Sequence, residues 1–355
     1  MGRSRRKSIR SRRIGPRRGP RGRKARPTGR DFFAGPAITE ELNPYATIII
    51  DEARRRGIAI EVTDAEGGFF RLTYGGRTVH CRESLSEFTS GVAVSICDDK
   101  AVTRRVVSAA GVQVPGQIDT DDGDLEAFLA RHGSVVVKPA RGEQGRGVAV
   151  GLETMDEVKA AIAEARQISD RVLVEECIKG HDFRQVVIDR RVVAAAIRRP
   201  AQVIGDGTST VKDLIARQSR RHERATGGES RIPMDGETGR CVRAGGYAFD
   251  SVLREGETLA VRKTANLHTG GTIHDVTAEV HGRLVEAAIK SAAAIDIPVV
   301  GIDLVVPSPR SSSYAFIEAN ERPGLANHDP QPTAERFVDL LFPLSIPTAV
   351  RGAVV

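Results

Sequence analysis

Short apolar runs that end in polar residues recur along the chain, and one of them opens its most informative stretch. Residues 134–139 read Ser-Val-Val-Val-Lys-Pro, a β-branched run that predicts a buried strand with Lys138 at its end. We expect a glycine-rich turn over 141–147 and a second strand over 148–151. A helix over 155–168 and a further strand over 171–182, with acidic residues at its end, should follow. The pattern therefore predicts a lobe of mixed strands and helices, with charged side chains at the strand ends.

The flanking sequence predicts further elements of both kinds. Upstream, residues 44–98 are expected to form a small α/β domain with a helix, a strand and a hairpin over 45–56, 58–62, 69–74 and 77–81. A helix with an acidic cap is expected to start at Asp98–Asp99. Downstream we expect strands over 185–189, 192–197, 299–306 and 314–320, and helices near 208–215 and over 276–295. The polar, glycine-rich segment 219–261 is expected to form mobile loops that face the substrate.

Two late strands carry polar residues where a buried strand should be apolar. Asp303 interrupts the run 299–306, and Glu318 and Asn320 lie two residues apart on the next strand, hence on one face. If the strands pair antiparallel, Asp303 can face them across the hairpin. Oxygen ligands of this kind suit Mg²⁺, which prefers carboxylates together with substrate phosphates. The alternative, a half-buried strand with outward polar residues, fits poorly with a charge in an otherwise apolar strand.

Charge changes the picture at the N-terminus. The chain has 53 basic and 46 acidic residues, but residues 1–30 hold 12 Arg and 2 Lys and no acid, so the remainder is mildly acidic. With almost no apolar residue, residues 1–30 are expected to be disordered. One interpretation is an arm that binds nucleic acid or another anionic surface, and the other is a solvated tail or an upstream extension of the coding region. The second is preferred, since no aromatic residue interleaves the arginines.

Composition excludes several classes of protein. No apolar run approaches the roughly 20 residues of a membrane helix, and no apolar stretch of a secretory signal follows the basic start. The four cysteines show no C-x-x-C spacing, which argues against a zinc site or a disulfide framework. We therefore expect a cytoplasmic protein of enzyme size with buried free thiols and no membrane partner.

The glycine-rich segment 141–147 gains meaning only from its surroundings. Glycines let backbone N–H groups turn toward an anion, which makes a phosphate site plausible, but G-x-x-G-x-G alone is more often a hairpin turn, and no Gly-Lys-Ser/Thr of a Walker A loop follows. The ordered set is more specific. A strand ending at Lys138, the glycine loop, Glu175 and Asp182 after a helix, and the cluster near Glu318 together resemble the ATP-grasp superfamily of carboxylate–amine ligases.

The resemblance implies a fold and a set of functional residues. It implies two α+β lobes that grip ATP, with Mg²⁺ (one or two ions, Mn²⁺ as an alternative), in a protein of α+β or α/β class. The residues implied for ATP are Lys100, Lys138, Gly142, Gly145, Gly147, Glu175, Glu176, Ile178 and Asp182. The residues implied for metal are Asp303, Glu318 and Asn320, and those implied for catalysis are Arg198, Lys263 and Asn266. Arg198 and Arg199 also stand at a strand exit, where a guanidinium can bind a carboxylate or an acyl phosphate.

Two further stretches narrow the resemblance. R-x-P-A-x-V-x-G-D-G at 198–207 is similar to the cyanophycin synthetase branch, whereas E-A-N-E-R-P-G-L-A-N-H-x-P-Q-P-T-A-E-R-F at 318–337 and C-R-E-S-L-S-E-F-T-S at 81–90 resemble the N-acetylglutaminylglutamine synthetase group. The resemblance covers residues 42–345. That group carries an acetyltransferase domain ahead of the ligase, so an acetylated donor is expected from a separate acetyltransferase, or else the substrate differs.

The prediction that follows is an ATP-dependent ligase of amino acids or acyl-amino acids, in a homo-oligomer. We expect a basic tail over 1–36, a small α/β domain over 37–97 and a nucleotide-binding lobe over 98–198. A substrate-facing insertion over 199–272 and a C-terminal lobe with the metal hairpin over 273–355 should follow. One alternative is a cyanophycin- or glutathione-synthetase-like ligase that differs within 199–272. Another is a nucleic-acid-binding protein acting through the tail, which salt-dependent DNA binding lost on deleting residues 1–30 would reveal; for the enzyme we expect only nonspecific nucleic-acid contact there.

Overall fold

The computed structural model describes residues 42–120, 124–142, 146–226, 228 and 230–345. The basic N-terminal tail lies outside the described residues. The α-helices are α1 Pro44–Arg55, α2 Gly91–Asp98, α3 Lys100–Ala109, α4 Leu125–His132, α5 Met155–Ala165, α6 Val211–Ala225, α7 Gly236–Ala244, α8 Gly282–Ile295 and α9 Thr333–Leu341. Short 3-10 helices are η1 Leu267–Thr269, η2 Thr277–Glu279, η3 Leu325–His328 and η4 Pro343–Ser345.

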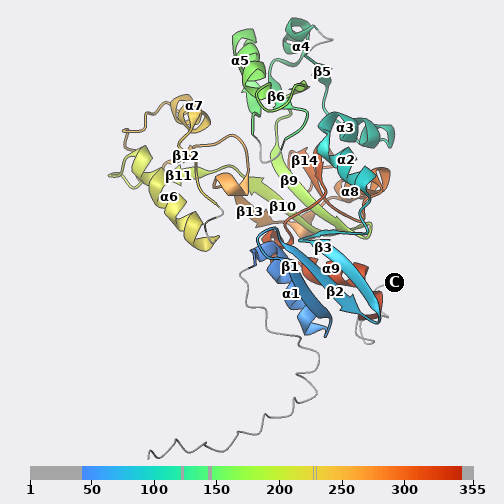
Figure 1. Ribbon diagram of the computed structural model, residues 1–355. Coiled ribbons are helices and arrows are strands. Elements are labelled where there is room, and N and C mark those ends of the chain that lie inside the picture. The colour runs from blue at the N-terminus through green and yellow to red at the C-terminus, as the bar shows by residue number, and fades with distance from the viewer. Residues whose placement is uncertain (1–41, 121–123, 143–145, 227, 229, 346–355) are drawn as a thin grey trace, which may run out of the picture.

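The strands form separate sheets that give the molecule its lobes (Figure 1). They are β1 Ala59–Asp64, β2 Phe69–Tyr74, β3 Arg77–Arg82, β4 Leu85–Ser86, β5 Gln117–Asp119, β6 Val135–Pro139, β7 Ala149–Leu152, β8 Val172–Glu176, β9 His181–Ile188, β10 Arg191–Arg199, β11 Gln202–Ile204, β12 Thr258–Ala260, β13 Thr272–Asp275, β14 Val299–Val306 and β15 Ala315–Asn320. The sheet orders are β1-β2-β3-β4, β5-β8-β6-β7, β13-β10-β9-β14-β15 and β11-β12, and all pairings between these strands are antiparallel.

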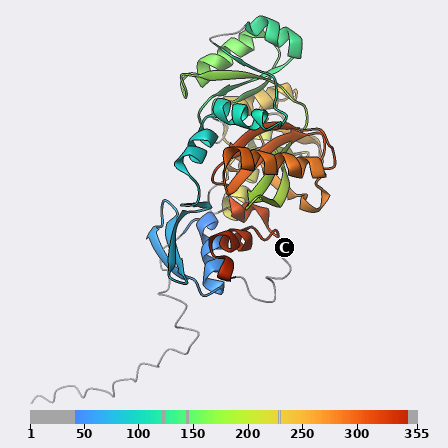
Figure 2. The same ribbon diagram turned by 90° about the vertical axis from the view of Figure 1, so that its right-hand side faces the viewer.

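The five-stranded sheet is the centre of the molecule. One face is covered by α8, α2 and α3, and Figure 2 shows α8 lying across it. Alternation along β9 explains this, because Phe183 and Val187 point into that apolar core while Arg184 and Val186 point to the opposite face. On that opposite face Val186 and Ile188 are buried, whereas Asp182 and Arg184 are charged. The opposite face is therefore apolar at one end of the strand and charged at the other.

The N-terminal layer covers the apolar end. It comprises α1 and the sheet β1-β2-β3-β4, and it shares one core with α9 from the far end of the chain. Ile49, Phe70 and Phe337 are fully buried in that core, which also receives Val186 and Ile188 from β9. The expected helix, strand and hairpin of this region are confirmed, with every boundary within two residues of the expected one.

Replacing Phe337 with alanine should destabilise the fold strongly. A fully buried Phe that joins the first and last helices leaves a large cavity, and such truncations cost about 3–5 kcal/mol. Urea unfolding of the full chain measures the loss. Phe69→Ala is the matched control, because Phe69 is 39% exposed and should lose clearly less. Equal losses in the two variants would show that α9 does not hold the N-terminal layer in place.

The nucleotide lobe has the strands and the helix that the sequence predicts, except that the strand expected over 171–182 ends at Glu176, because His181 and Asp182 already belong to β9 of the central sheet. The strands β6, β7 and β8 and the helix α5 form one core with α4, and α5 begins with a capping box between Thr154 and Glu157. Helix α5 ends at Ala165, three residues before the expected end, and α8 begins at Gly282 rather than near 276 because η2 precedes it. Helix α2 was not expected; it is capped by Ser90 and packs its apolar side on the central sheet.

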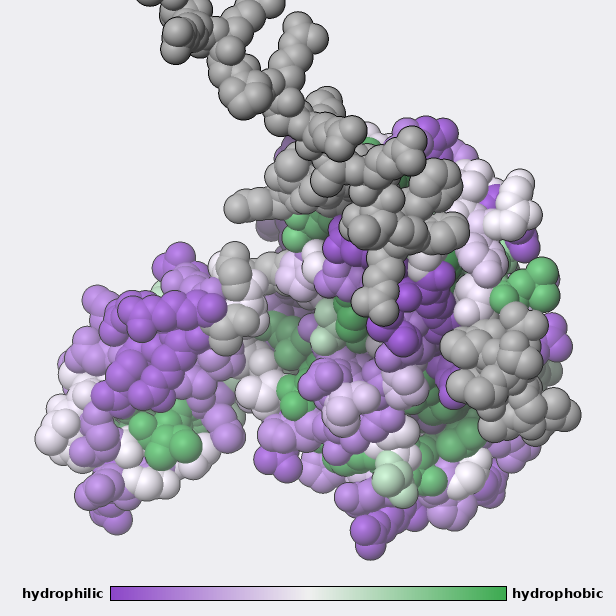
Figure 3. Space-filling model, turned by 90° about the horizontal axis from the view of Figure 1, so that it is seen from below, coloured by the Kyte–Doolittle hydropathy of each residue, from purple (hydrophilic) through white to green (hydrophobic). Residues whose placement is uncertain are grey.

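The expectation of loops over 219–261 is wrong. Helix α6 continues to Ala225, α7 follows, and β12 pairs with β11 to complete a small lobe, the insertion lobe, residues 199–263. Its core is compact and includes Val211, Ile215 and Leu259. Because most residues of α6 are charged or polar, only a narrow apolar stripe marks it as a helix, and hydrophilic side chains cover most of this lobe in the view from below (Figure 3). Among the described residues, no helix is long and apolar enough to cross a membrane.

Candidate active site

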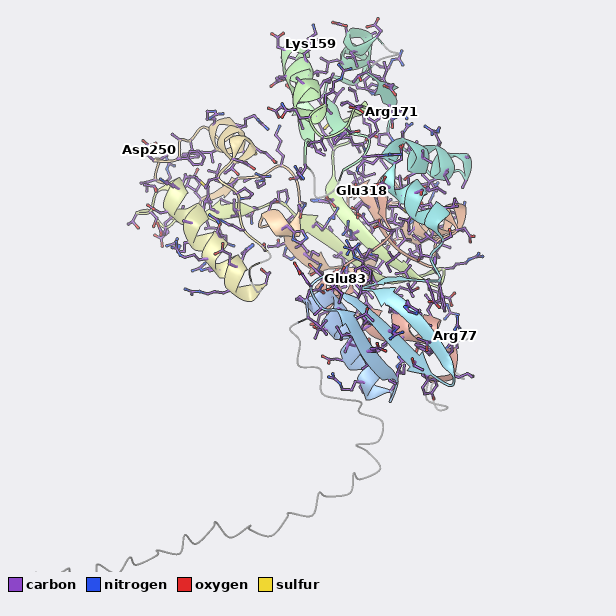
Figure 4. The ribbon with its side chains drawn as sticks, in the orientation of Figure 1. Arg77, Glu83, Lys159, Arg171, Asp250 and Glu318 are labelled. Carbon is purple, nitrogen blue, oxygen red and sulfur yellow. The ribbon has the colours of Figure 1, made fainter. Side chains whose placement is uncertain are left out.

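The charged end of the central sheet brings together residues from four strands. Residues directly opposite each other in an antiparallel pair point to the same face. The register places Asp182 opposite Arg198, Arg184 opposite Asp303, and Asp303 opposite Glu318. Asn320 lies opposite Gly301, two residues from Asp303, and so shares that face. The predicted hairpin is confirmed, and Figure 4 shows Glu318 near the centre of the molecule, where the lobes meet.

We call this end of the sheet the charged face; it comprises Asp182, Arg184, Arg198, Asp303, Glu318 and Asn320. Its two arginines hold Asp303 in a network of ion pairs. Arg184 Nε and Nη2 donate to the two carboxylate oxygens of Asp303 at 2.6 and 2.7 Å, and Arg198 Nη2 donates to Oδ2 of the same carboxylate at 2.8 Å. Arg198 Nε also donates to Asp182 Oδ1 at 2.7 Å. Burial opposes the charge on Asp303, but the two guanidinium groups outweigh it and hold its pKa below the usual value. Asp303 is therefore held in its charged form, with its carboxylate paired to Arg184 and Arg198.

The predicted metal ligands fit a magnesium ion in part of its coordination. Asp303 and Glu318 present adjacent carboxylates, and Asn320 Nδ2 lies 3.4 Å from Asp303 Oδ2, which brings the amide into the same group. A carboxylate has about four lone-pair positions, so Asp303 can accept the arginines and still face a cation. No group of three or more His, Cys, Asp or Glu side chains suited to a metal occurs in the part of the chain that the structure describes. Water and phosphate oxygens would have to complete the shell, as Mg²⁺ prefers.

A second pair of charged residues lies on the nucleotide lobe. Lys138 Nζ is 2.7 Å from Glu175 Oε2, and both side chains are buried. The register explains the contact, since Lys138 lies opposite Leu173 and Val136 lies opposite Glu175, so the two charged residues are diagonal neighbours on one face. Apart from the nearby charge of Arg104, the contacts of the described residues show no further partner for this pair, and a buried ion pair is only partly compensated for its loss of water. The pair is thus suited to take additional polar contacts from a ligand.

The glycine-rich turn 141–147 is tied to the start of α3. Lys100 Nζ donates to the Gly142 carbonyl at 2.7 Å, and the Lys100 N–H donates to Ala140 at 3.0 Å. Gly142 and Gly147 have φ of 140° and 68°, which disfavours a side chain at either position. A Cβ at Gly147 would also approach Ile168 Cδ1 to 2.6 Å. The structure thus brings Lys100 to the predicted phosphate loop, while Gly145 lies outside the described residues.

The remaining residues predicted for ATP follow the end of β8. The Glu176 side chain turns toward the base of the lobe, where Oε2 accepts from the Gly116 N–H at 3.1 Å and Oε1 lies 3.7 Å from His132 Nδ1. Since the Glu176 N–H also donates to the Gly116 carbonyl at 2.9 Å, the main-chain carbonyl is the group of Glu176 on which the predicted adenine contact depends. Ile178 lies in the link between β8 and β9, and Asp182 is on β9 beside Arg198.

Two of the residues predicted for catalysis make their described contacts outside the ion pairs of the charged face. Lys263 Nζ donates to the Val150 carbonyl of β7 at 3.0 Å, which joins the insertion lobe to the nucleotide lobe. Asn266 Oδ1 accepts from the His268 N–H at 2.9 Å and caps η1. Among the contacts of the described residues, neither side chain is paired with Arg198 or Asp303. Arg198 is the predicted catalytic residue that the structure places within the charged face.

Sequence reasoning missed two residues near this face. Arg184 interrupts the apolar run of β9 as Asp303 interrupts β14, and that signal could have identified it. His328, on η3, is 3% exposed, and its Nδ1 has no hydrogen-bond partner within the described part of the chain. Burial, aided by Arg184 and Arg198, lowers the pKa of His328 to about 4. His328 is therefore a neutral side chain with an unused polar atom beside the arginines.

Comparison with known proteins identifies relatives that are named as synthetases. No protein-family model matches the chain. A cyanophycin synthetase from Nostoc sp. (strain PCC 7120) is 33% identical over 318 residues, which cover 85% of this chain and 35% of that protein. A glutathione biosynthesis bifunctional protein from Clostridium perfringens is 26% identical over 322 residues, 85% of this chain and 41% of that protein. The chain thus spans between a third and a half of the length of these curated relatives.

The fold has a counterpart among solved structures. A bifunctional glutathione synthetase from Pasteurella multocida superposes with a TM-score of 0.60 at 23% identity, over 86% of this chain and 44% of that chain. The central antiparallel sheet, the nucleotide lobe and these similarities define an ATP-grasp fold. The chain belongs to the ATP-grasp superfamily of ligases. Within that superfamily, its sequence is similar to the cyanophycin and glutathione synthetases.

Proposed function

We propose that the protein is an ATP-dependent ligase that joins the carboxyl group of one amino acid or acyl-amino acid to the amine of another. The observation that carries the proposal is the charged face, where Arg198, Asp303 and Glu318 lie beside the lobe that holds Lys138 and Glu175. A fixed guanidinium, together with a cation that the neighbouring carboxylates would hold, suits a reaction in which a phosphate and a carboxylate must approach each other despite their like charges. The relatives named as synthetases support the same reading.

The proposed reaction has two steps. A carboxylate oxygen of the first substrate attacks the γ-phosphorus of ATP, which gives an acyl phosphate and ADP. The amine of the second substrate then attacks the acyl carbon, and the amide forms as phosphate leaves and the amine loses its protons. Lys100 and Lys138 would offset phosphate charge, Glu175 and the main chain at Glu176 and Ile178 would bind adenine, and Asp182 the ribose.

The charged face supplies the rest of the chemistry. Arg198 is paired through Nε with Asp182 and through Nη2 with Asp303, and these acids raise its pKa against the effect of burial, so it stays charged and would stabilise the acyl phosphate. Asp303, Glu318 and Asn320 would hold Mg²⁺, which when bound neutralises charge on the phosphates. Arg184 fixes the orientation of the Asp303 carboxylate through two hydrogen bonds. Lys263 and Asn266 are proposed to close the insertion lobe over the substrates rather than to contact the reacting atoms.

The finer proposal is an activity of the N-acetylglutaminylglutamine synthetase type, the synthesis of a dipeptide osmolyte. Its support is that the two stretches carrying that resemblance contact each other. Ser84 Oγ donates to the Pro323 carbonyl at 2.7 Å, and Arg322 Nη1 lies 3.2 Å from Glu83 Oε2. Figure 4 shows Glu83 where the N-terminal layer meets the central sheet. The contact fixes the loop that directly follows Asn320, so the two stretches form one structural unit next to the charged face.

ADP release tests the proposal. The full chain, ATP and Mg²⁺ are combined with pairs of amino acids, including N-acetylglutamine with glutamine, aspartate with arginine, and γ-glutamylcysteine with glycine. We expect ADP only when a carboxylate donor and an amine are both present, and a product whose mass is their sum less one water. The pair that reacts identifies the branch. ADP release that is independent of any added amino acid, or no release with any pair, would overturn the ligase assignment.

A further inference from the structure

A polar cluster lies on the face of the nucleotide sheet that meets α3. The edge strand β5 pairs with β8, and the register sets Gln117 opposite Glu175, so both side chains point to one face. Lys138 shares this face, since it contacts Glu175, and Ala101 of α3 packs there against Leu173. The other face of the sheet belongs to the apolar core that α4 and α5 cover. The Gln117 amide therefore lies beside two residues predicted to bind ATP, and the proposed function gives it no role.

Two buried polar atoms of this cluster have no partner. Within the described part of the chain, Gln117 Oε1 and Arg104 Nε are buried and make no hydrogen bond. Arg104 reaches the cluster from α3, where its Nη2 donates to the carbonyl of Pro115. Burial lowers the pKa of Arg104, and the charge of Glu175 opposes that shift, which places the two residues close together. Folded proteins rarely leave buried polar groups unpaired, because such groups lose their water without compensation. The two unpaired atoms therefore point to a polar ligand on this face.

The chemistry of the two atoms indicates what that ligand is. Gln117 Oε1 accepts hydrogen bonds, whereas Arg104 Nε donates one. Adenine offers the complementary groups side by side, because its 6-amino group donates and an adjoining ring nitrogen accepts. Guanine carries an oxygen in place of that amino group, and an oxygen cannot donate to Gln117 Oε1. An adenine base therefore matches the unpaired atoms better than a guanine base does.

We propose that Gln117 binds the 6-amino group of the adenine of ATP and thereby selects adenine nucleotides. The inference rests on the proposed function, in which Glu175 contacts the base, and it adds a side chain that determines which base is accepted. In an antiparallel pair the Cβ atoms of opposite residues are about 4.5–5.5 Å apart, so one flat base can contact both Gln117 and Glu175. Gln117 is partly exposed, and its amide makes no hydrogen bond to the described residues, so it is free to turn toward a base.

The test compares Q117M with the control Q202M in the full chain. Methionine keeps the length of glutamine without its amide, and Gln202 is exposed on β11 of the insertion lobe. Calorimetry measures the affinity of each protein, with Mg²⁺, for ATP and for purine riboside triphosphate, which carries hydrogen in place of the 6-amino group. We expect the unmodified chain and Q202M to prefer ATP by the same ratio. In Q117M that ratio should fall by about 2- to 10-fold, the effect of one neutral hydrogen bond, because only ATP can make the lost contact.

The ratio separates base recognition from a structural role. If Q117M loses affinity for both nucleotides equally, Gln117 only supports the fold of the lobe and the proposal is overturned. Q117N, which keeps an amide oxygen, should retain part of the ratio, and a ratio as low as that of Q117M would count against a specific contact. Equal binding of ATP and the analogue by the unmodified chain would overturn this inference while the ligase assignment stands. Failure of the unmodified chain to bind ATP at all would overturn both.

Discussion

Replacing Glu318 with alanine should lower the rate of ligation by about 1,000-fold or more while the protein stays folded. Glu318 supplies one of two adjacent carboxylates, and removal of a single electrostatic contact to the transition state costs about 10²–10³-fold, with more expected when a metal ligand is lost. The fold should survive, because Asp303 keeps both arginines and Glu318 is only half-buried. Rates of ADP release at increasing Mg²⁺ measure the effect.

The Mg²⁺ dependence separates a metal ligand from a structural residue. A ligand variant should need a higher Mg²⁺ concentration for half-maximal rate, and Glu318→Asp should recover part of the activity. Asp250→Ala is the control, since Asp250 is an exposed acid at the outer end of the insertion lobe (Figure 4). Near-normal ADP release by Glu318→Ala, with an unchanged Mg²⁺ requirement, would refute the metal assignment.

Replacing Lys138 with methionine should weaken ATP binding by about 10- to 100-fold. The Lys138 ammonium group, which is buried beside Glu175, would bind a phosphate of ATP. A hydrogen bond to a charged group is worth about 1.5–3 kcal/mol, which corresponds to this loss of affinity. Calorimetric titration with ATP and Mg²⁺ gives the affinity. Lys159→Met on the outer side of α5 is the matched control, because Lys159 is 64% exposed and should leave ATP affinity unchanged.

A second variant separates a direct loss of ATP contact from a loss of protein stability. Lys138→Met leaves the Glu175 carboxylate buried without its partner, and such a loss destabilises proteins by about 3–5 kcal/mol. The double variant Lys138→Met/Glu175→Gln removes the unpaired charge, so its melting temperature should exceed that of Lys138→Met. We expect its ATP affinity to remain low. Full ATP affinity in either variant would remove Lys138 from the nucleotide site.

The strands near the predicted metal site show which structural features the local sequence pattern can predict. Alternation with period two predicts that Glu318 and Asn320 share a face, and Asp303 is marked by its charge within an apolar run; the register of β14 and β15 bears out that these three residues lie on one face. The same reasoning predicted β6 with Lys138 at its end and the hairpin of the N-terminal layer. It failed for the part of α6 from Ser219 on and for α7, where apolar residues do not outnumber charged ones and the apolar stripe is narrow.

The sequence by itself therefore determined the longer strands, the polar residues within β14 and β15 and the membership of the superfamily, because these depend on residue spacing within a few positions. Only the tertiary structure decided that Arg184 and Arg198 share Asp303, that Lys138 pairs with Glu175, and that α9 completes the N-terminal layer. It also placed Gln117 opposite Glu175, with Arg104 nearby. The physical reason is that these contacts join segments far apart in the chain, and only the order and register of the strands in each sheet determine which side chains meet.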